Sequence, residues 1–209
     1  MAIAVLDFLA VLSCVMAIDD RRERERAARR RLIVATARKI AEAEGWDAVT
    51  TRRLSTEIEY SQPVLYKHFS GMDHVAAAVA LDGFGELADV TRRARSDATT
   101  ARESLARTAR AYLDFARDNP AVYDAMFVRA TPLKFATEDT PTQLEEAFAG
   151  LRDVVGDIAG DRDADTLTEV FWASLHGLVT LSRAGRLRPD HDAERIRLLV
   201  DEFTDRPRG

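Results

Sequence analysis

The sequence predicts an all-α fold. Residues that favour helices dominate a chain of 209 residues, in which there are only 10 glycines and 6 prolines. Long stretches repeat apolar residues with the 3.6-residue period of a helix, whereas alternating runs rich in Val, Ile and Thr are missing. The composition is 46% hydrophobic, which is enough for a sizeable core in one domain or in two small domains that share an interface.

Residues 1–18, MAIAVLDFLAVLSCVMAI, form an apolar stretch at the N-terminus. The stretch is slightly shorter than the roughly 20 residues that cross a bilayer, and it contains Asp7. It also lacks the positively charged start of a secretory signal. We therefore expect an N-terminal extension upstream of a start at Met16, and no membrane partner. A membrane anchor is the alternative.

Charge divides the rest of the chain into two expected domains, residues 19–70 and 71–209. The net charge of the whole chain is -5, but residues 19–70 carry 12 Lys and Arg against 9 Asp and Glu. Seven arginines lie between Arg21 and Arg31. Such a run is either a solvated helical face with internal ion pairs or a basic arm that touches phosphates.

Three helices are expected in the basic part of the chain. Apolar positions at helical spacing continue the first helix to Gly45, which ends it as a C-cap. A second helix is expected over 51–59 with Thr50 as its N-cap, and its inner face is formed by Leu54 and Ile58. A third follows over 62–69, with Ser61 as N-cap and Pro63 in its first turn.

Two short helices joined by a turn, after a longer amphipathic helix, form the layout of a helix-turn-helix. Within the third helix, Leu65 and Phe69 lie four residues apart and can face inward, which turns the polar side chains outward. These side chains suit DNA: Gln can bind adenine, Lys and His can reach phosphate, and Tyr can contact phosphate or a thymine methyl. The residues are Gln62, Tyr66, Lys67 and His68, and Arg52 and Arg53 at the start of the second helix can add contacts.

The remaining helices form a predicted C-terminal bundle for effector binding and dimerisation. The expected helices cover 72–95, 101–118, 120–127, 142–159, 163–184 and 190–203, with Asn119 as an N-cap and a loop over 130–140. The last two helices carry more apolar surface than one core requires, which predicts a twofold homodimer that recognises an inverted repeat. The interface candidates are Phe171, Leu175, Leu178, Ile196, Leu199 and Phe203.

Residues 31–79 resemble the N-terminal DNA-binding domain of the TetR family of transcriptional regulators. The resemblance rests on Gly45-Trp46, Thr50-Thr51-Arg52, Leu65-Tyr66 and Phe69, which fall at the helix ends and in the recognition helix of that family. It implies DNA contacts from Thr51, Arg52, Gln62, Pro63, Tyr66 and His68. It also implies a repressor that releases its operator when a small molecule binds. One residue departs from the family pattern, because Met72 stands where a lysine usually opens the next helix.

The segment FWASLHGLVTLSRAGRL, residues 171–187, resembles the Trp-x-x-x-His-Gly signature of one class of C-terminal domain in this family. In that class Trp172 and His176 lie near the effector cavity or the dimer interface. The candidates for a ligand pocket are Tyr112, Phe115, Tyr123, Met126, Phe127, Trp172 and His176. That these residues are ordinary core is an open alternative.

No enzyme motif appears in the sequence. The four histidines are scattered, Cys14 is the only cysteine, and no GxGxxG, P-loop or GxSxG pattern occurs. We therefore expect no catalytic residue, metal ligand or cofactor, and a reducing, cytoplasmic location. The expected partners are double-stranded DNA, a second copy of the chain and an unknown small-molecule effector. The alternatives are a DNA-binding factor without a ligand and an enzyme.

Overall fold

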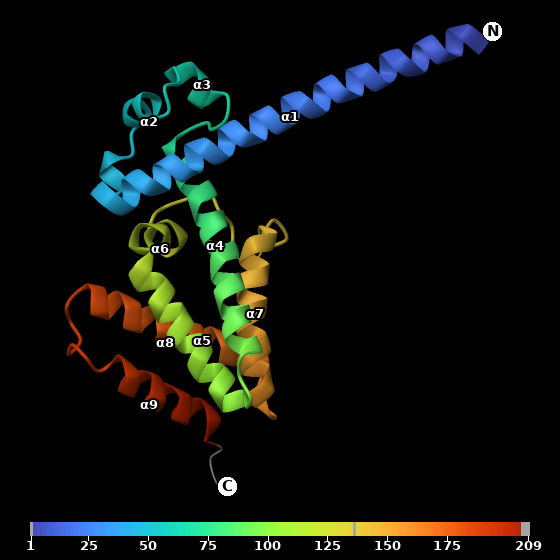
Figure 1. Ribbon diagram of the computed structural model, residues 1–209. Helices are drawn as coiled ribbons and strands as arrows, with labels where there is room; N and C mark the ends of the chain where they lie inside the picture. The colour runs from blue at the N-terminus through green and yellow to red at the C-terminus, as the bar shows by residue number, and fades with distance from the viewer. Residues whose placement is uncertain (1, 136, 206–209) are drawn as a thin grey trace. The chain divides into compact units, whose positions relative to one another are not determined.

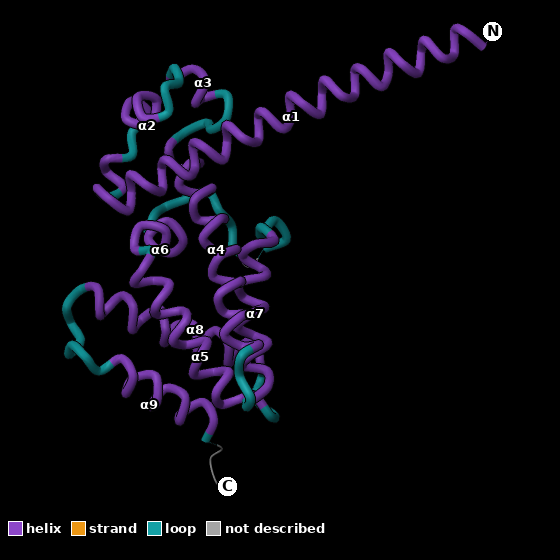
Figure 2. Tube along the Cα trace, in the orientation of Figure 1, coloured by secondary structure: helices purple, strands orange, loops and turns teal. Residues whose placement is uncertain are grey.

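The computed structural model describes residues 2–135 and 137–205, and it describes side chains from residue 19 onward. Within these ranges every regular element is a helix and no strand is present (Figures 1 and 2). The all-α prediction is therefore confirmed. Internal contacts divide the chain into an N-terminal unit that ends at Ala76 and a C-terminal unit that begins at Ala77.

The N-terminal unit consists of one long helix and two short ones. They are α1 (Ala2–Glu44), the 3-10 turn η1 (Trp46–Ala48), α2 (Thr51–Glu57) and α3 (Gln62–Tyr66), followed by the first residues of α4 (Met72–Ser96). Helix α1 ends as predicted at Gly45, whose φ of 84° is accessible to glycine at little cost. The side chains of Ile33, Ala37, Ile40 and Ala41 are all buried, so these four positions form the inner face of α1.

Helices α2 and α3 form the predicted pair, although both are shorter than expected. The Thr50 hydroxyl accepts a hydrogen bond from the Arg53 N–H at 3.1 Å, which confirms this cap. Helix α2 stops at Glu57 because the chain reverses at Glu59, where φ is 56°. The predicted cap at Ser61 was wrong in its chemistry, since Ser61 occupies the N-cap position of α3 without a side-chain hydrogen bond.

The apolar stretch of residues 1–18 lies outside the side chains that the structure describes, so its predicted role stays a prediction. Among the residues with described side chains, no helix has an apolar segment long enough to cross a membrane.

The C-terminal unit is a bundle arranged around α5. Its other helices are the rest of α4, α6 (Pro120–Phe127), α7 (Thr142–Ala159), α8 (Ala164–Arg183) and α9 (Asp192–Thr204). Helix α5 (Ala101–Asp118) contacts α6, α7, α8 and α9, because its broad apolar face is covered from several sides (Figure 1). These bounds lie within two residues of the predicted ranges.

The starts of α8 and α6 are capped differently. Asp163 caps α8 by accepting a hydrogen bond from the Thr166 N–H at 2.8 Å. Asn119 occupies the N-cap position of α6 without making a side-chain cap bond. Its amide instead donates to the Phe115 carbonyl at 3.0 Å, which satisfies the end of α5.

Candidate functional site

The short helix α3 presents a polar outer face over an apolar anchor. Leu65 and Phe69 are each 5% exposed, so they hold α3 and the turn after it against the N-terminal unit. Tyr66 is 57% exposed, and such exposure of a large aromatic side chain is typical of a residue that contacts a binding partner. The other exposed candidates are Arg52, Gln62, Pro63 and Lys67, whereas Thr51 and His68 are half-buried.

Arginines of α1 lie beside the turn that follows α3. The Arg30 guanidinium donates to the His68 carbonyl at 3.1 Å and lies 4.1 Å from the centre of the Phe69 ring. Partial burial lowers the pKa of His68, and the positive charges of Arg26, Arg29 and Arg30 lower it further. His68 is therefore largely neutral at pH 7, so the positive charge at this turn comes from the arginines and from Lys67.

Arginines of the basic run of α1 form contacts within the protein, and the contact of this run with phosphates stays a prediction. At its start Arg21 pairs with Glu25 at 3.0 Å, which is the internal ion pair of a solvated face. At its end Arg30 is bound to the turn after α3. On α2, Arg53 pairs with Glu44 at 3.0 Å, so its guanidinium is already occupied and Arg52 is the freer of the two arginines.

Met72, the residue that replaces the lysine of the family pattern, packs into the N-terminal unit. It lines a small apolar pocket with Leu54, Leu65 and Phe69. The Thr51 hydroxyl donates to the Met72 sulfur at 3.5 Å, so Met72 fastens the start of α4 to α2. The Met72 thioether carries no charge, so this side chain contributes packing at a position where a lysine would contribute a positive charge for phosphate.

A cavity of about 690 Å³ lies within the C-terminal unit, between α4, α5, α7, α8 and the loop before α7. Its volume falls within the range of small-molecule sites, about 300–1,000 Å³. The walls are mostly apolar, and aromatic rings contribute much of the surface. The lining side chains are Phe84, Leu87, Tyr112, Phe127, Phe135, Thr137, Thr140, Leu144, Glu145, Ala147, Phe148, Leu151, Glu169, Trp172 and Ala173.

A chain of hydrogen bonds supports the wall of this cavity. The Trp172 N–H donates to the Tyr112 hydroxyl at 3.1 Å, the hydroxyls of Tyr112 and Tyr123 are 2.9 Å apart, and Tyr123 lies 2.7 Å from His176 Nδ1. Since an indole N–H can only donate, every hydroxyl is satisfied when Tyr112 donates to Tyr123 and Tyr123 donates to Nδ1. The chain ties α5, α6 and α8 together.

Burial favours the neutral form of each group in this chain. It raises the pKa of Tyr112 to about 12, because an anionic phenolate would lose its hydration. Burial also raises the pKa of Tyr123 and lowers that of His176. Two neutral phenols and a neutral imidazole can donate and accept in sequence, so the hydrogen bonds of the chain need no charged group.

The predicted pocket residues divide into three groups. Tyr112, Phe127 and Trp172 line the cavity. Tyr123 and His176 stand behind its wall, where they complete the hydrogen-bond chain. The prediction that Phe115 and Met126 line the cavity needs correction, because both are buried among core side chains and neither reaches it.

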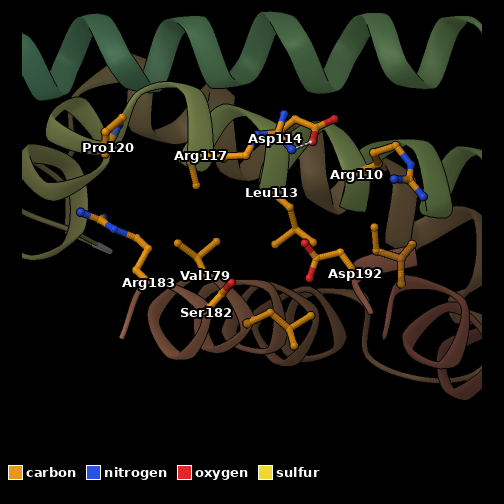
Figure 3. A pocket seen from close by; sticks show the side chains of 12 residues that line it. Arg110, Leu113, Asp114, Arg117, Pro120, Val179, Ser182, Arg183 and Asp192 are labelled. Carbon is orange, nitrogen blue, oxygen red and sulfur yellow. Dashed lines mark hydrogen bonds and ion pairs between the residues drawn. The ribbon is translucent and has the colours of Figure 1, made fainter. Parts of the chain in front are cut away.

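A second, smaller cavity of about 240 Å³ lies where α5, α8 and α9 meet. Figure 3 shows Leu113 of α5 and Val179 of α8 pointing into the same space, with charged side chains around them. Two of these arginines already have partners: Arg117 pairs with Asp114, and Arg183 pairs with Asp124 outside the cavity. None of the predicted pocket residues lines it. Its size is below the usual range for ligand sites.

Most of the predicted dimer contacts need correction. Phe171, Leu175, Ile196 and Phe203 are between 0% and 7% exposed, because they fill the core between α5, α8 and α9. They have no surface left for a partner. Leu178 and Leu199 are half-buried, so they alone of the candidates remain at the surface.

Several residues of the site were missed by sequence reasoning. The cavity also takes Phe84 and Leu87 from α4 and Leu144, Phe148 and Leu151 from α7, together with two carboxylates, Glu145 and Glu169. The helical spacing of the apolar residues predicted only an apolar face on each helix. Such a face can line a cavity or pack in the core, and the spacing does not distinguish the two. In the part of the chain with described side chains, no three His, Cys, Asp or Glu residues are grouped closely enough to hold a metal ion.

Known proteins resemble the whole of this arrangement. Residues 33–79 match the model of the bacterial regulatory proteins of the tetR family, and residues 105–203 match that of the tetracyclin repressor-like C-terminal domain. YobS, an uncharacterised HTH-type transcriptional regulator of Bacillus subtilis (strain 168), is 32% identical over 155 residues, which are 72% of this chain and 77% of the relative. An uncharacterised HTH-type transcriptional regulator of Mycobacterium tuberculosis is 28% identical over 84% of this chain and 77% of its own length.

Among solved structures, a protein of unknown function from Rhodococcus sp. RHA1 superimposes with a TM-score of 0.68 at 27% sequence identity. The match covers 83% of this chain and 92% of the Rhodococcus chain, so it includes both the N-terminal and the C-terminal helices.

Proposed function

This chain belongs to the TetR family of bacterial DNA-binding transcriptional regulators, and from that premise we propose that it is a repressor that leaves its operator when a small molecule binds. The observation that carries the proposal is the large apolar cavity, with Tyr112, Phe127 and Trp172 in its wall. The cavity reaches solvent at Phe135, which is 48% exposed, so a lipophilic molecule could enter it and bury its own apolar surface there.

The DNA-reading part of the proposal rests on α3. In a helix-turn-helix the second helix enters the major groove, and the exposed Gln62, Tyr66 and Lys67 would then face base edges and phosphates. Gln62 has the geometry for a bidentate contact with adenine. Arg26, Arg29 and Arg30 of α1 add positive charge beside the turn after α3.

Helix α4 is the covalent connection between the two functions. Met72, its first residue, lines the small pocket of the N-terminal unit, and Phe84 and Leu87 of the same helix line the large cavity. A ligand that moves these two cavity residues can therefore act on the helix that starts within the DNA-binding unit. The protein has one conformation that binds DNA and one that does not. Release follows only if the ligand has the higher affinity for the conformation that does not bind DNA.

The test combines two titrations on the same protein. Selection of bound fragments from genomic DNA would supply the operator, and a screen of lipophilic compounds would then be read by operator affinity and by Trp172 fluorescence. An effector should lower operator affinity about 5-fold to 150-fold, and operator DNA should lower the affinity for the effector by the same factor. Trp46→Phe should keep the fluorescence signal and Trp172→Phe should lose it.

Two outcomes of this test would contradict the proposal. A compound that quenches Trp172 without changing operator affinity would show a pocket that is not coupled to DNA. A thorough screen without any binder would favour the DNA-binding factor that has no ligand.

We also propose that the repressor is a homodimer through α8 and α9. The apolar side chains that remain at this surface support the proposal: Val170 is 52% exposed, Leu181 is 42% exposed and Leu198 is 50% exposed. Val170 and Leu181 lie three helical turns apart on one stripe of α8. Isologous contact of such a stripe with its own copy would bury it, and two α3 helices would then face an inverted repeat.

A further inference from the structure

We propose that the large cavity is selective for lipophilic organic cations, an inference that rests on the ligand-released repression proposed above. The observation that carries it is the juxtaposition of six aromatic rings and two carboxylates in one wall, with no basic side chain among the described residues of the lining. Shape and apolar surface alone would accept any lipophilic molecule. The charges decide which of them binds best.

The aromatic rings come from five helices and one loop and lie close to one another. Phe84 is 5.3 Å from Phe127 and 6.0 Å from Phe135, measured between ring centres, and Phe127 is 5.8 Å from Trp172. Tyr112 and Phe148 complete the set. The face of each ring carries negative electrostatic potential, so a cation within about 6 Å of the rings is attracted and an anion is repelled.

The two carboxylates add charge of the same sign. Glu145 lies in the first turn of α7, and Glu169 lies on α8 one turn before Trp172. Both line the cavity, and both side chains are exposed, so each carries a negative charge at neutral pH. Within the part of the chain that the structure describes, neither carboxylate forms an ion pair or a side-chain hydrogen bond, so both are free to face a ligand.

The preferred ligand follows from these two features. Its apolar body would fill the aromatic volume, and its positive charge would lie near Glu145 and Glu169. The carboxylates and the ring faces would repel the negative charge of a fatty acid or another lipophilic anion. No basic side chain of the described lining could form an ion pair with that charge, so anions should bind weakly.

A matched pair of probes tests the sign of the charge. Tetraphenylphosphonium and tetraphenylborate each have four phenyl rings around one central atom, so they differ mainly in charge. Binding to the full-length protein would be measured by calorimetry and by Trp172 fluorescence at fixed ionic strength. We expect the cation to bind at least about tenfold more tightly than the anion, because one charge pair a few ångströms apart near a protein surface is worth about tenfold.

Variants locate the preference in the cavity. Glu145→Gln and Glu169→Gln should each weaken tetraphenylphosphonium binding several-fold, and the double variant should weaken it about tenfold or more. The matched control is Glu146→Gln, which removes the same charge from an exposed neighbour on α7 that does not line the cavity. This control should leave the ratio of cation to anion affinity unchanged.

The outcomes separate this inference from the proposed function. Equal or tighter binding of tetraphenylborate, no binding of tetraphenylphosphonium, or a preference unchanged in the double variant would overturn the cation selectivity. Operator affinity is measured in the same samples. A probe of either charge that occupies the cavity and lowers operator affinity supports the proposed repression, whereas occupancy without any change in operator affinity counts against it.

Discussion

Gln62, the first residue of α3, and Lys67, the residue that follows its last, should contribute to DNA binding in different ways. Both side chains are exposed, while Leu65 between them anchors the helix. Gln62→Ala should weaken operator binding by about 1 to 3 kcal/mol and relax the preference at one base pair of each half-site. Lys67→Ala should weaken all sequences alike and reduce the slope of log affinity against log salt by about 1.

Binding-site selection and salt titrations on the three proteins would measure both effects. An unchanged motif and affinity in Gln62→Ala would mean that α3 does not dock as proposed. Circular dichroism would verify that each variant retains its helices.

His176 should make the stability of the protein depend on pH. Burial lowers the pKa of the folded ring below its ordinary value of 6.5, so the unfolded chain binds the proton more tightly. The stabilisation is fully present above about pH 6.5 and is lost as the pH falls through the lowered folded pKa. Protonation also turns Nδ1 from an acceptor into a donor, which breaks its bond from Tyr123.

Denaturant unfolding between about pH 7.5 and pH 5 would measure this dependence. The free energy of unfolding should fall with pH in the wild-type protein and fall less in His176→Gln. His74→Gln, which changes an exposed histidine in the N-terminal unit, should behave like the wild type. If the free energy of unfolding of His176→Gln falls with pH as much as that of the wild type, other groups cause the pH dependence.

At the scale of the helices, Gly83 allows α4 and α6 to approach closely. A Cβ at this position would lie 2.4 Å from a Val122 methyl carbon and 2.8 Å from the Met126 sulfur. Gly83→Ala should therefore force the two helices apart and destabilise the protein by about 1 to 3 kcal/mol. The higher helix propensity of alanine offsets up to about 1 kcal/mol of this loss.

Gly85 provides the control within the same helix. A Cβ at this position meets nothing within 4 Å, so Gly85→Ala should stabilise α4 by up to about 1 kcal/mol. Thermal unfolding of the two variants would compare them directly. If both glycines respond alike, the close approach of α4 and α6 is not a constraint on the fold.

At the scale of the whole molecule, the exposed stripe of α8 should hold two copies together. Leu181→Glu places a charge where the proposed dimer would exclude water, and it should convert the protein into monomers at micromolar concentration. Leu181 is 42% exposed in one copy, so the substitution should leave the fold intact. Phe203 would be a poor choice, because it is buried and a charge there would unfold α9.

Light scattering with size-exclusion chromatography would give the mass of each variant. Val128→Glu is the matched control, since Val128 is 65% exposed and lies at the end of α6, away from the proposed interface. It should remain a dimer. A wild-type protein that is monomeric at micromolar concentration would contradict the proposed assembly and the inverted-repeat operator.

The sequence by itself determined the helices and the polar face of α3. Local signals carry this information: the 3.6-residue period, the Thr50 cap, the glycine at position 45 and the spacing of Leu65 and Phe69 all act between residues close in the chain. Helix ends were less certain, as the unused cap at Ser61 and the short α3 illustrate. Helix ends fray, and the last turn often changes its hydrogen-bond pattern, so local signals place such ends only to within one or two residues.

Only the tertiary structure decided what each apolar face covers. Periodicity marked Phe171 and Leu175 as apolar positions, but α5 and α9 bury them inside one copy, while Val170 and Leu181 stay exposed. The cavity likewise combines residues from α4, α5, α7 and α8, and its carboxylates were indistinguishable from ordinary surface charges in the sequence. The reason is physical: a helical stripe is buried by whichever elements pack on it, and that choice depends on contacts between residues far apart in the chain.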